Sequence, residues 1–104
     1  MVYGMTKLIY KFSDSENQLL IQERHISFEE IIAALLNEQL LDVIDHPNIY
    51  KYPNQKMYVV RVNNYVYLVP FIKKDHQTVF LKTIFPSRKA KKHYLNNEEL
   101  GDGS

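Results

Sequence analysis

The sequence LKTIFPSRKAKKHYL, residues 81–95, contains an apolar strand followed by a short basic helix. The arrangement predicted for the other elements depends on this stretch. Strand-forming residues run from Val79 to Ile84, and Pro86 and Ser87 follow them. A serine hydroxyl can accept a hydrogen bond from a free backbone N–H at a helix start, so Ser87 is a favourable N-cap. The pattern therefore predicts a helix that begins at Arg88.

The first turn of this predicted helix carries two cations, Arg88 and Lys89. The helix dipole is already positive there, and each cation loses about 0.3 to 1 kcal/mol relative to a neutral residue. Unfavourable local choices concentrate at functional sites, and free N–H groups beside cations favour a phosphate. We interpret this stretch as an anion site. The alternative is a solvated basic helix end that Ala90 and Tyr94 hold against the core.

Charge is divided along the chain although the net charge is only +1. Residues 1–45 hold three Lys or Arg against eight Asp or Glu, a net charge of −5. Residues 46–97 hold ten Lys or Arg against Asp75 alone, a net charge of +9, and residues 98–104 add −3. We expect the late strands and the last helix to gather their cations on one exposed surface, which would attract a polyanion such as nucleic acid.

Composition excludes several classes of protein. The chain of 104 residues suits one domain, and it has no cysteine for a disulfide or a thiolate metal site. Its three glycines, at 4, 101 and 103, leave no phosphate-binding loop inside the domain, and its four histidines lack metal-binding spacing. We expect no metal and no cofactor. The N-terminal sequence lacks a signal-peptide core and no stretch approaches a membrane span, so we expect a cytoplasmic protein without membrane contact.

The pattern of apolar and polar residues predicts an α+β fold of the order β-α-α-β-β-β-α, a small antiparallel sheet with helices packed on it. Ser13 and Ser27 each begin a capping-box pattern at a helix start, and Asn63-Asn64 is a hairpin signal. Pro70 should occupy a bulge or an edge position, because it cannot donate a ladder hydrogen bond. The strands are expected at 7–12, 57–62, 65–72 and 78–84, and residues 40–44 are either a strand or the end of the second helix.

Two further expectations concern the core and the chain end. Leu19 and Leu20 should face inward from the first helix, and helical spacing places five apolar residues of the second helix in the core. These five are Phe28, Ile31, Ile32, Leu35 and Leu36. The domain should cover residues 1–97, with 98–104 a disordered acidic tail.

Tyrosines alternate with cations between residues 50 and 67, a composition that can stack bases and hold phosphates. The tyrosines are Tyr50, Tyr52, Tyr58, Tyr65 and Tyr67. Most of them also suit the half-buried surface of a sheet, so we expect only one or two to face a ligand.

The segments ERHISFEEI (23–31) and FPSRKA (85–90), with three strands between them, resemble the BrnT-like toxins of type II toxin–antitoxin modules, within the RelE/ParE-like superfamily. The resemblance covers residues 7–95. The family motif Lys-His-Gly-Val/Ile-Ser-Phe places Arg24 at its His and His25 at its Gly, and the motif Ser-Ala-Arg-Arg-Ala falls on residues 86–90.

The resemblance implies a RelE-like fold and a metal-independent endoribonuclease that inhibits growth by cleaving cellular RNA. It also implies a cognate antitoxin that neutralises the toxin and carries the pair to promoter DNA. In such cleavage an RNA 2′-oxygen attacks the adjacent phosphorus while a base, an acid and cations assist. The residues available suggest catalytic roles for Arg88, Lys82, His25 and His93, and RNA binding by Arg61, Lys89, Lys56 and Arg24.

Two other functions fit the same residues. A non-catalytic nucleic-acid-binding module would use the same basic face and leave RNA intact, with salt-dependent binding. A protein that poisons a host enzyme by contact, as ParE-like relatives do with gyrase, would change DNA topology instead. The individual residues also have simpler roles: Lys82 at a strand edge, Arg61 paired with a glutamate of the second helix, and the histidines on the surface.

Overall fold

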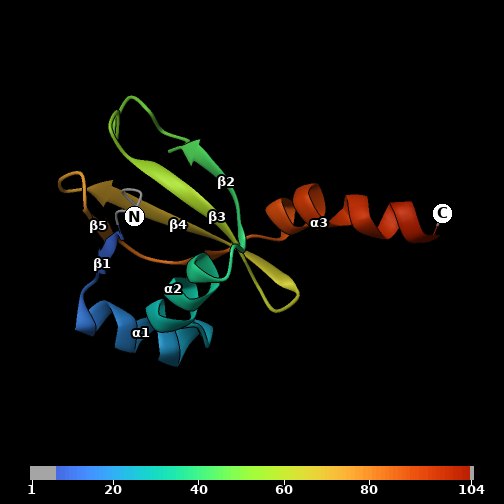
Figure 1. Ribbon diagram of the computed structural model, residues 1–104, viewed down its shortest axis with the longest axis horizontal. Coiled ribbons are helices and arrows are strands. Elements are labelled where there is room, and N and C mark those ends of the chain that lie inside the picture. Colours follow the sequence, from blue (N-terminus) through green and yellow to red (C-terminus); the bar gives the residue numbers. More distant parts are fainter. Residues whose placement is uncertain (1–6, 104) are drawn as a thin grey trace, which may run out of the picture.

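The computed structural model describes residues 7–103, which form a β-sheet with helices on both faces (Figure 1). In chain order the elements are β1 (Ile9–Lys11), α1 (Asp14–Arg24), α2 (Phe28–Leu36), β2 (Leu40–Asp45), β3 (Lys56–Val62), β4 (Tyr65–Lys73), β5 (Thr78–Leu81), β6 (Phe85–Pro86) and α3 (Arg88–Gly103). The predicted α+β class is confirmed. The ambiguous segment after α2 is a strand, β2.

The six-stranded sheet has the order β1-β5-β4-β3-β2, and β6 pairs with a separate part of β4. Its neighbouring strands are antiparallel except for β1 and β5, which run parallel with Tyr10 opposite Val79. The prediction of an antiparallel sheet is therefore wrong for this pair. A parallel pair needs a long crossover, and here the connection passes through two helices and three strands, so no local pattern announces it.

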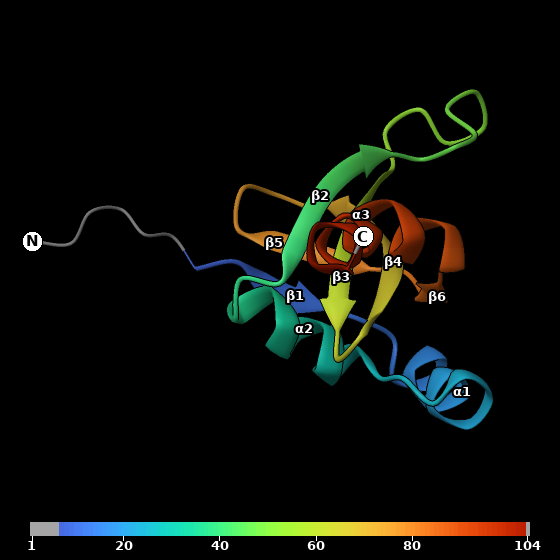
Figure 2. The same ribbon diagram turned by 90° about the vertical axis from the view of Figure 1, so that its right-hand side faces the viewer.

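The sheet is covered on both faces, by α1 and α2 on one and by α3 on the other (Figures 1 and 2). Successive strand residues point to opposite faces, so Val60 and Val69 enter the core under α1 and α2, whereas Val59 and Val66 enter the core under α3. Covering both faces explains why β3 and β4 are almost continuously apolar.

Both N-terminal helices begin at the predicted serines. At α2 the capping box is complete: the Glu30 backbone N–H donates to Ser27 Oγ, and the Glu30 carboxylate accepts from the Ser27 backbone N–H. At α1, Ser13 Oγ accepts from the Glu16 backbone N–H at 3.2 Å. The Glu16 carboxylate, however, accepts from the Thr83 hydroxyl at 2.6 Å, so this capping residue is directed toward the segment after β5.

Two predicted core positions are exposed. Leu36 is 73% exposed and Ala34 is buried in its place, because a residue five positions after Ile31 lies about 140° around the helix. Leu19 is 47% exposed, whereas Leu20 is buried as predicted. The inward stripe of each helix is therefore narrower than the run of apolar residues in the sequence.

Pro70 marks a break in the pairing of β4. It lies in an interior strand rather than at an edge, but on one side of β4 the partner changes at this point from β5, which pairs with 71–73, to β6, which pairs with 67–68. The Lys82 backbone N–H donates to the Pro70 carbonyl at 2.8 Å. The predicted strand 78–84 accordingly ends at Leu81, and residues 82–84 leave the sheet before β6.

The helix α3 begins at Arg88 as predicted. Ser87 Oγ accepts from the Ala90 backbone N–H at 3.0 Å, which confirms Ser87 as the N-cap. The helix runs to Gly103, past the expected end of the ordered domain. Disorder in the acidic tail 98–104 stays a prediction, and Ser104 and residues 1–6 lie outside the described part of the chain. Within residues 7–103, no helix has the length and apolarity needed to cross a membrane.

Candidate functional site

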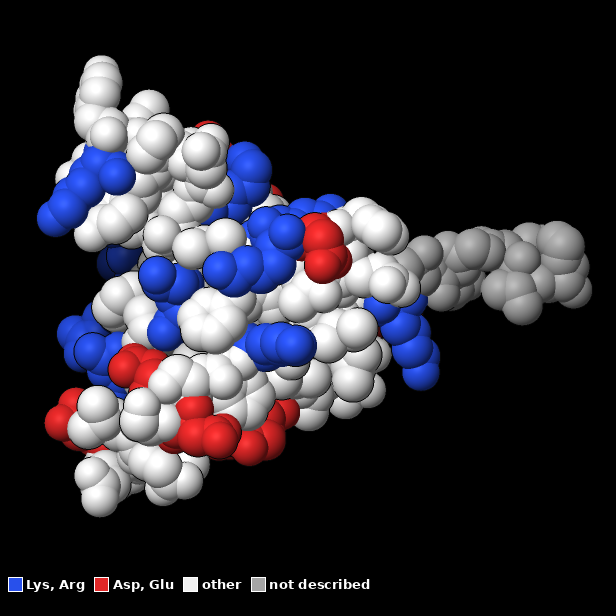
Figure 3. All heavy atoms as spheres, turned by 90° about the vertical axis from the view of Figure 1, so that its left-hand side faces the viewer, with Lys and Arg blue, Asp and Glu red and all other residues white. Residues whose placement is uncertain are grey.

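Charged side chains are separated on one face of the molecule (Figure 3). Lys and Arg side chains form a band across its middle, at the level of the sheet, and Asp and Glu side chains gather below at the level of α1 and α2. Both of these helices carry acidic residues in their first turns, where the helix dipole favours them. Acidic and basic side chains are therefore separated on this face, whereas α3, which carries the cations of residues 88–92, extends toward the opposite side of the molecule in Figure 1.

A groove of about 410 Å³ lies where the pairing of β4 is broken. Residues 82–85 leave the sheet at this point, and α1 approaches them from one side and the loop between β2 and β3 from the other. The side chains that give the groove its chemistry come from these three segments: Glu16, His46, Tyr52, Lys82, Thr83 and Phe85. This open groove thus brings together a cation, a carboxylate, an imidazole and two aromatic rings.

Lys82 stands on a fixed backbone in this groove. Its N–H is hydrogen-bonded to Pro70, and its neighbour Thr83 donates its hydroxyl proton to Glu16 Oε2 at 2.6 Å. The Lys82 side chain itself is exposed. An exposed ammonium on an anchored backbone is suited to meet an anion without rearrangement of the chain.

The loop between β2 and β3 holds His46 in a defined orientation. The His46 backbone N–H donates to the Gln55 carbonyl at 3.0 Å, and His46 Nδ1 accepts from the Asn48 backbone N–H at 3.0 Å. The His46 and Tyr52 rings lie 4.5 Å apart between centroids. Asn48 also accepts from the backbone N–H of Lys51 and of Tyr52, so the loop is closed by its own hydrogen bonds.

Arg24 joins the end of α1 to the rim of the groove. Its guanidinium donates to the Ile84 carbonyl and lies 5.3 Å from the centroid of the Phe85 ring. Stacking on an aromatic face suits the planar guanidinium. Arg24 and Lys82, which the sequence assigned to RNA binding and catalysis, therefore lie at the same groove.

Two other predicted residues flank this region along the chain. Arg88 is exposed at the first position of α3, three residues after Phe85. His25 is exposed and ends α1 in the left-handed conformation, with φ 57°. Glycine or asparagine is usual at a helix end in the left-handed conformation. The backbone conformation of His25 therefore explains why the motif quoted above has glycine at this position.

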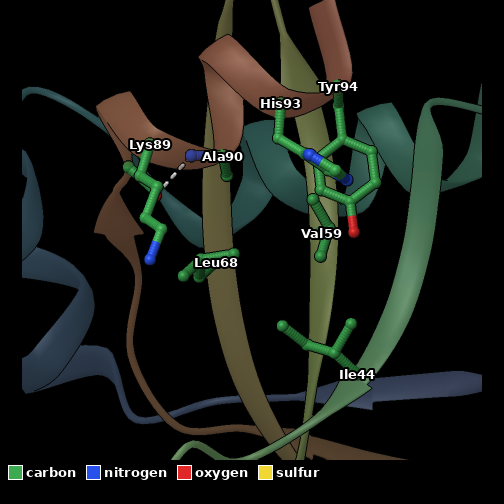
Figure 4. Close-up of a pocket in the computed structure, with 8 residues that line it drawn as sticks. Ile44, Val59, Leu68, Lys89, Ala90, His93 and Tyr94 are labelled. Carbon is green, nitrogen blue, oxygen red and sulfur yellow. Dashed lines mark hydrogen bonds between the residues drawn. The ribbon is translucent and has the colours of Figure 1, made fainter.

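Lys89 and His93 belong to a second hollow, beneath α3 (Figure 4). This cavity of about 210 Å³ is mostly apolar, and Ile44, Val59 and Leu68 form its floor on three strands. His93 packs edge-on against Tyr94, with ring centroids 4.7 Å apart. The two predicted residues thus share a site with each other but not with the groove of Lys82.

Tyr94 fastens α3 to β2. Its hydroxyl donates to Asp42 Oδ2 at 2.7 Å. This hydrogen bond lowers the pKa of the Asp42 carboxyl, with a further contribution from the Val43 backbone N–H. It raises the pKa of the Tyr94 phenol, because the bond favours the protonated form of the donor.

Arg61 and Lys56 lie apart from the groove. Arg61 lines a different hollow beside α2 and the β3–β4 turn, and its side chain donates to Asn63 and Asn64. Lys56 forms an ion pair with Asp45 at 2.7 Å. The expectation that the cations gather on one surface is therefore wrong for Arg61, because β3 and the segment after β5 lie on opposite sides of β4. Neither Arg61 nor Arg88 lines the groove of Lys82.

Sequence reasoning missed three residues of the groove. The sequence suggested no part in a site for Glu16 or His46, and it indicated Tyr52 only as one of five tyrosines that alternate with cations. Each is close to Lys82 only because the sheet brings the β2–β3 loop and α1 to the break at Pro70. The sole local signal in the sequence was Glu16 at the third position of a helix, which is typical of a capping box. The sequence does not indicate that the Glu16 carboxylate instead accepts from Thr83. Among residues 7–103, no three His, Asp or Glu side chains are grouped to hold a metal ion.

The fold defines a class of small α+β domains in which two helices cover one face of the sheet and a C-terminal helix lies on the other. The crystal structure of BrnT, a ribonuclease toxin of Brucella abortus, has this fold: the match covers 82% of this chain and 100% of that one, with a TM-score of 0.57 and 13% sequence identity. The predicted BrnT-like architecture is thereby confirmed. No protein-family model and no curated protein matches the sequence.

Proposed function

We propose that this protein is a toxin that cleaves RNA and is neutralised by a protein antitoxin. The observation that carries the proposal is the groove at the break in β4, which Lys82, Tyr52 and Phe85 all line. A single RNA strand requires this combination of cations for its phosphates and aromatic faces for its bases. The fold shared with a ribonuclease toxin supports the same assignment.

The groove suits transfer of a phosphoryl group without a metal ion. The RNA 2′-oxygen attacks the adjacent phosphorus, and Lys82 and Arg24 offset the negative charge that grows on the phosphoryl oxygens. Arg24 keeps N–H groups for this purpose, since a guanidinium has five and the Ile84 carbonyl accepts only part of them. Arg88, Lys89, Arg61 and Lys56 are proposed to bind phosphates farther along the strand. His25 and His93, the proton-transfer candidates from the sequence, do not line this groove.

The antitoxin is proposed to cover the basic band with an acidic segment. The band gathers Lys and Arg side chains on the face in Figure 3, so an acidic partner would compete directly with RNA for it. Recovery of growth on co-expression of the adjacent open reading frame is the simplest sign of such a partner.

The test is cleavage of RNA by the purified chain in the presence of EDTA, with and without ribosomes. Lys82→Ala is expected to lower the cleavage rate about 10²- to 10³-fold, because it removes one charge aimed at the transition state. Lys74→Ala is the matched control, since Lys74 lies over the Phe80 ring at the far end of β5. In cells, induction of the chain should arrest growth, and Arg88→Ala should relieve the arrest.

RNA that remains intact under all these conditions would refute the enzyme. If the intact RNA is nevertheless bound, with salt-dependent affinity, the chain is instead a non-catalytic nucleic-acid-binding module.

A further inference from the structure

We infer that RNA is cleaved within the groove between α1 and the β2–β3 loop, with Glu16 as the base and His46 as a neutral hydrogen-bond donor to the phosphoryl group. This inference rests on the proposed function and locates its reaction centre. Neither residue is suggested by the sequence, and His25 and His93 do not line this groove.

The hydrogen bond from the Asn48 backbone assigns the tautomer of His46. Because Nδ1 accepts that bond, the proton of the neutral ring is on Nε2. Nδ1 has no second lone pair with which to take a proton from substrate, so the neutral ring acts as a donor. The contact with Tyr52 and the backbone bond to Gln55 hold the His46 ring in the lining of the groove.

Glu16 is placed to accept a proton. Its backbone N–H is bound to Ser13 Oγ, which fixes the first turn of α1, and one carboxylate oxygen, Oε2, accepts from Thr83 at 2.6 Å. The other oxygen, Oε1, is the acceptor available to a ligand. The residue is half-buried, in contrast to the exposed Asp14 of the same turn. A carboxylate oriented by a hydroxyl is a suitable base for a 2′-OH.

In the cleavage reaction Lys82 acts as the general acid. Glu16 takes the proton of the 2′-OH, the 2′-oxygen forms a bond to phosphorus, and the bond between phosphorus and the 5′-oxygen breaks. The Lys82 ammonium gives its proton to the leaving 5′-oxygen, while His46 Nε2–H stabilises a phosphoryl oxygen throughout. The products are a 2′,3′-cyclic phosphate and a 5′-hydroxyl, and water returns the proton from Glu16 to Lys82.

Two substitutions at His46 test this role. The glutamine side-chain amide can place an N–H near the position of Nε2 but cannot act as an acid or a base. His46→Gln is therefore expected to keep cleavage within about tenfold of wild type, whereas His46→Ala should lose about 10²-fold. His76→Ala, on the exposed turn before β5, is the matched control. Equal losses in the two His46 variants, or no loss in either, would overturn the donor role.

Glu16→Gln keeps an oxygen for Thr83 and should fold normally, but it should lose about 10²- to 10⁴-fold in cleavage while still binding RNA. Thr83→Val should lower kcat with little change in KM, because Thr83 only positions the Glu16 carboxylate. Thr83→Ser should keep the wild-type kcat, because serine retains the hydroxyl group. Glu23→Gln, on an exposed part of α1, is the control.

Binding of an oligonucleotide with 2′-O-methyl ribose, which cannot be cleaved, gives a second readout. Amide resonances of residues 46–55 and 82–85 should shift on binding, and those around the cavity under α3 should not. If wild type cleaves RNA and these variants and shifts are unaffected, the reaction centre lies elsewhere and the proposed function stands. If wild type leaves RNA intact, the proposed function fails and this inference fails with it.

Discussion

His25 is the clearest case of a residue whose backbone explains its position. It ends α1 with φ 57° and ψ 37°, which a side chain with a Cβ adopts at a cost of about 1 to 2 kcal/mol. The short loop between the two helices leaves little choice, because Ser27 must already be extended to cap α2. The strain at His25 therefore follows from joining two helices within three residues.

His25→Gly is expected to raise the free energy of unfolding by about 0.5 to 1 kcal/mol. Glycine removes the left-handed strain, although it also gains freedom in the unfolded chain, which offsets part of the benefit. Urea unfolding of the variant measures the change. Glu23→Gly, inside α1, is the control and should lose about 1 kcal/mol. A variant at position 25 that is less stable than wild type would mean that the imidazole makes stabilising contacts of its own.

The predictable residues were those whose partners are near in sequence. Ser13, Ser27 and Ser87 were predicted as helix caps because each bonds a backbone group three residues ahead. Asn17 was not predicted, although it is buried and its side chain both donates to Glu29 and accepts from the Phe28 backbone N–H. Its partners are on the next helix, and no periodicity in the sequence indicates such a pair.

At the scale of elements, α3 is attached to the sheet by few interactions. Ala90 and Leu95 are buried against Val59 and Val66, and the Tyr94–Asp42 hydrogen bond joins the helix to β2. The cavity beneath the helix shows that the apolar contact is incomplete. The polar bond therefore contributes to holding the helix, and it depends on the ionisation of both partners.

The Tyr94–Asp42 bond should stabilise the protein fully between about pH 4 and about pH 10, and less outside that range. The folded-state pKa of Asp42 is lowered, so its contribution is present above the unfolded-state pKa and is lost as the pH falls through the folded-state value. The pKa of Tyr94 is raised, so its contribution is present below the unfolded-state pKa and is lost as the pH rises through the folded-state value. Tyr94→Phe should therefore be less stable than wild type at pH 7, and the difference should be smaller at pH 2.

Urea unfolding across this pH range provides the measurement. Tyr50→Phe is the matched control, because Tyr50 is 95% exposed on the β2–β3 loop and should show no difference from wild type at any pH. A difference between Tyr94→Phe and wild type that persists unchanged at pH 2 would assign the stabilisation to packing rather than to the hydrogen bond.

Helices and strands could be predicted from the sequence where a single local pattern determines where they begin or end. The β3–β4 hairpin follows from Asn63, which has φ 57° at the turn, and α3 follows from Ser87. The division of the predicted strand 78–84 into β5, a bridging segment and β6 did not follow, although Pro70 gave a partial warning. That division depends on which strand lies beside β4, and it creates the groove.

For the whole molecule, the sequence predicted the separation of acidic and basic residues, but it did not predict which hollow each cation lines. Counting residues by segment gave the basic C-terminal half, and Figure 3 shows basic and acidic side chains separated on one face. Counting cannot tell that Lys82 lines one groove, Lys89 a cavity under α3, and Arg61 a hollow beside α2. Those assignments depend on the strand order, which pairs segments that are distant in sequence.

The division among hollows predicts unequal contributions of the cations to RNA binding. Each phosphate contact on a single strand contributes about 0.7 to the slope of the logarithm of the binding constant against the logarithm of the salt concentration. Lys82→Gln should therefore lower that slope by about 0.7 for a 2′-O-methyl oligonucleotide. Lys74→Gln should leave the slope unchanged, since Lys74 lies over the Phe80 ring and lines none of the three hollows.

Titrations between about 50 and 200 mM salt, followed by fluorescence anisotropy, provide the comparison. Both variants remove one positive charge, so an effect of net charge alone would weaken binding equally in the two. Only a phosphate seated at the groove changes the slope for Lys82→Gln and not for Lys74→Gln. Equal slopes in the two variants would mean that RNA follows the diffuse field of the basic band instead of entering the groove, and the reaction centre proposed there would lose its substrate.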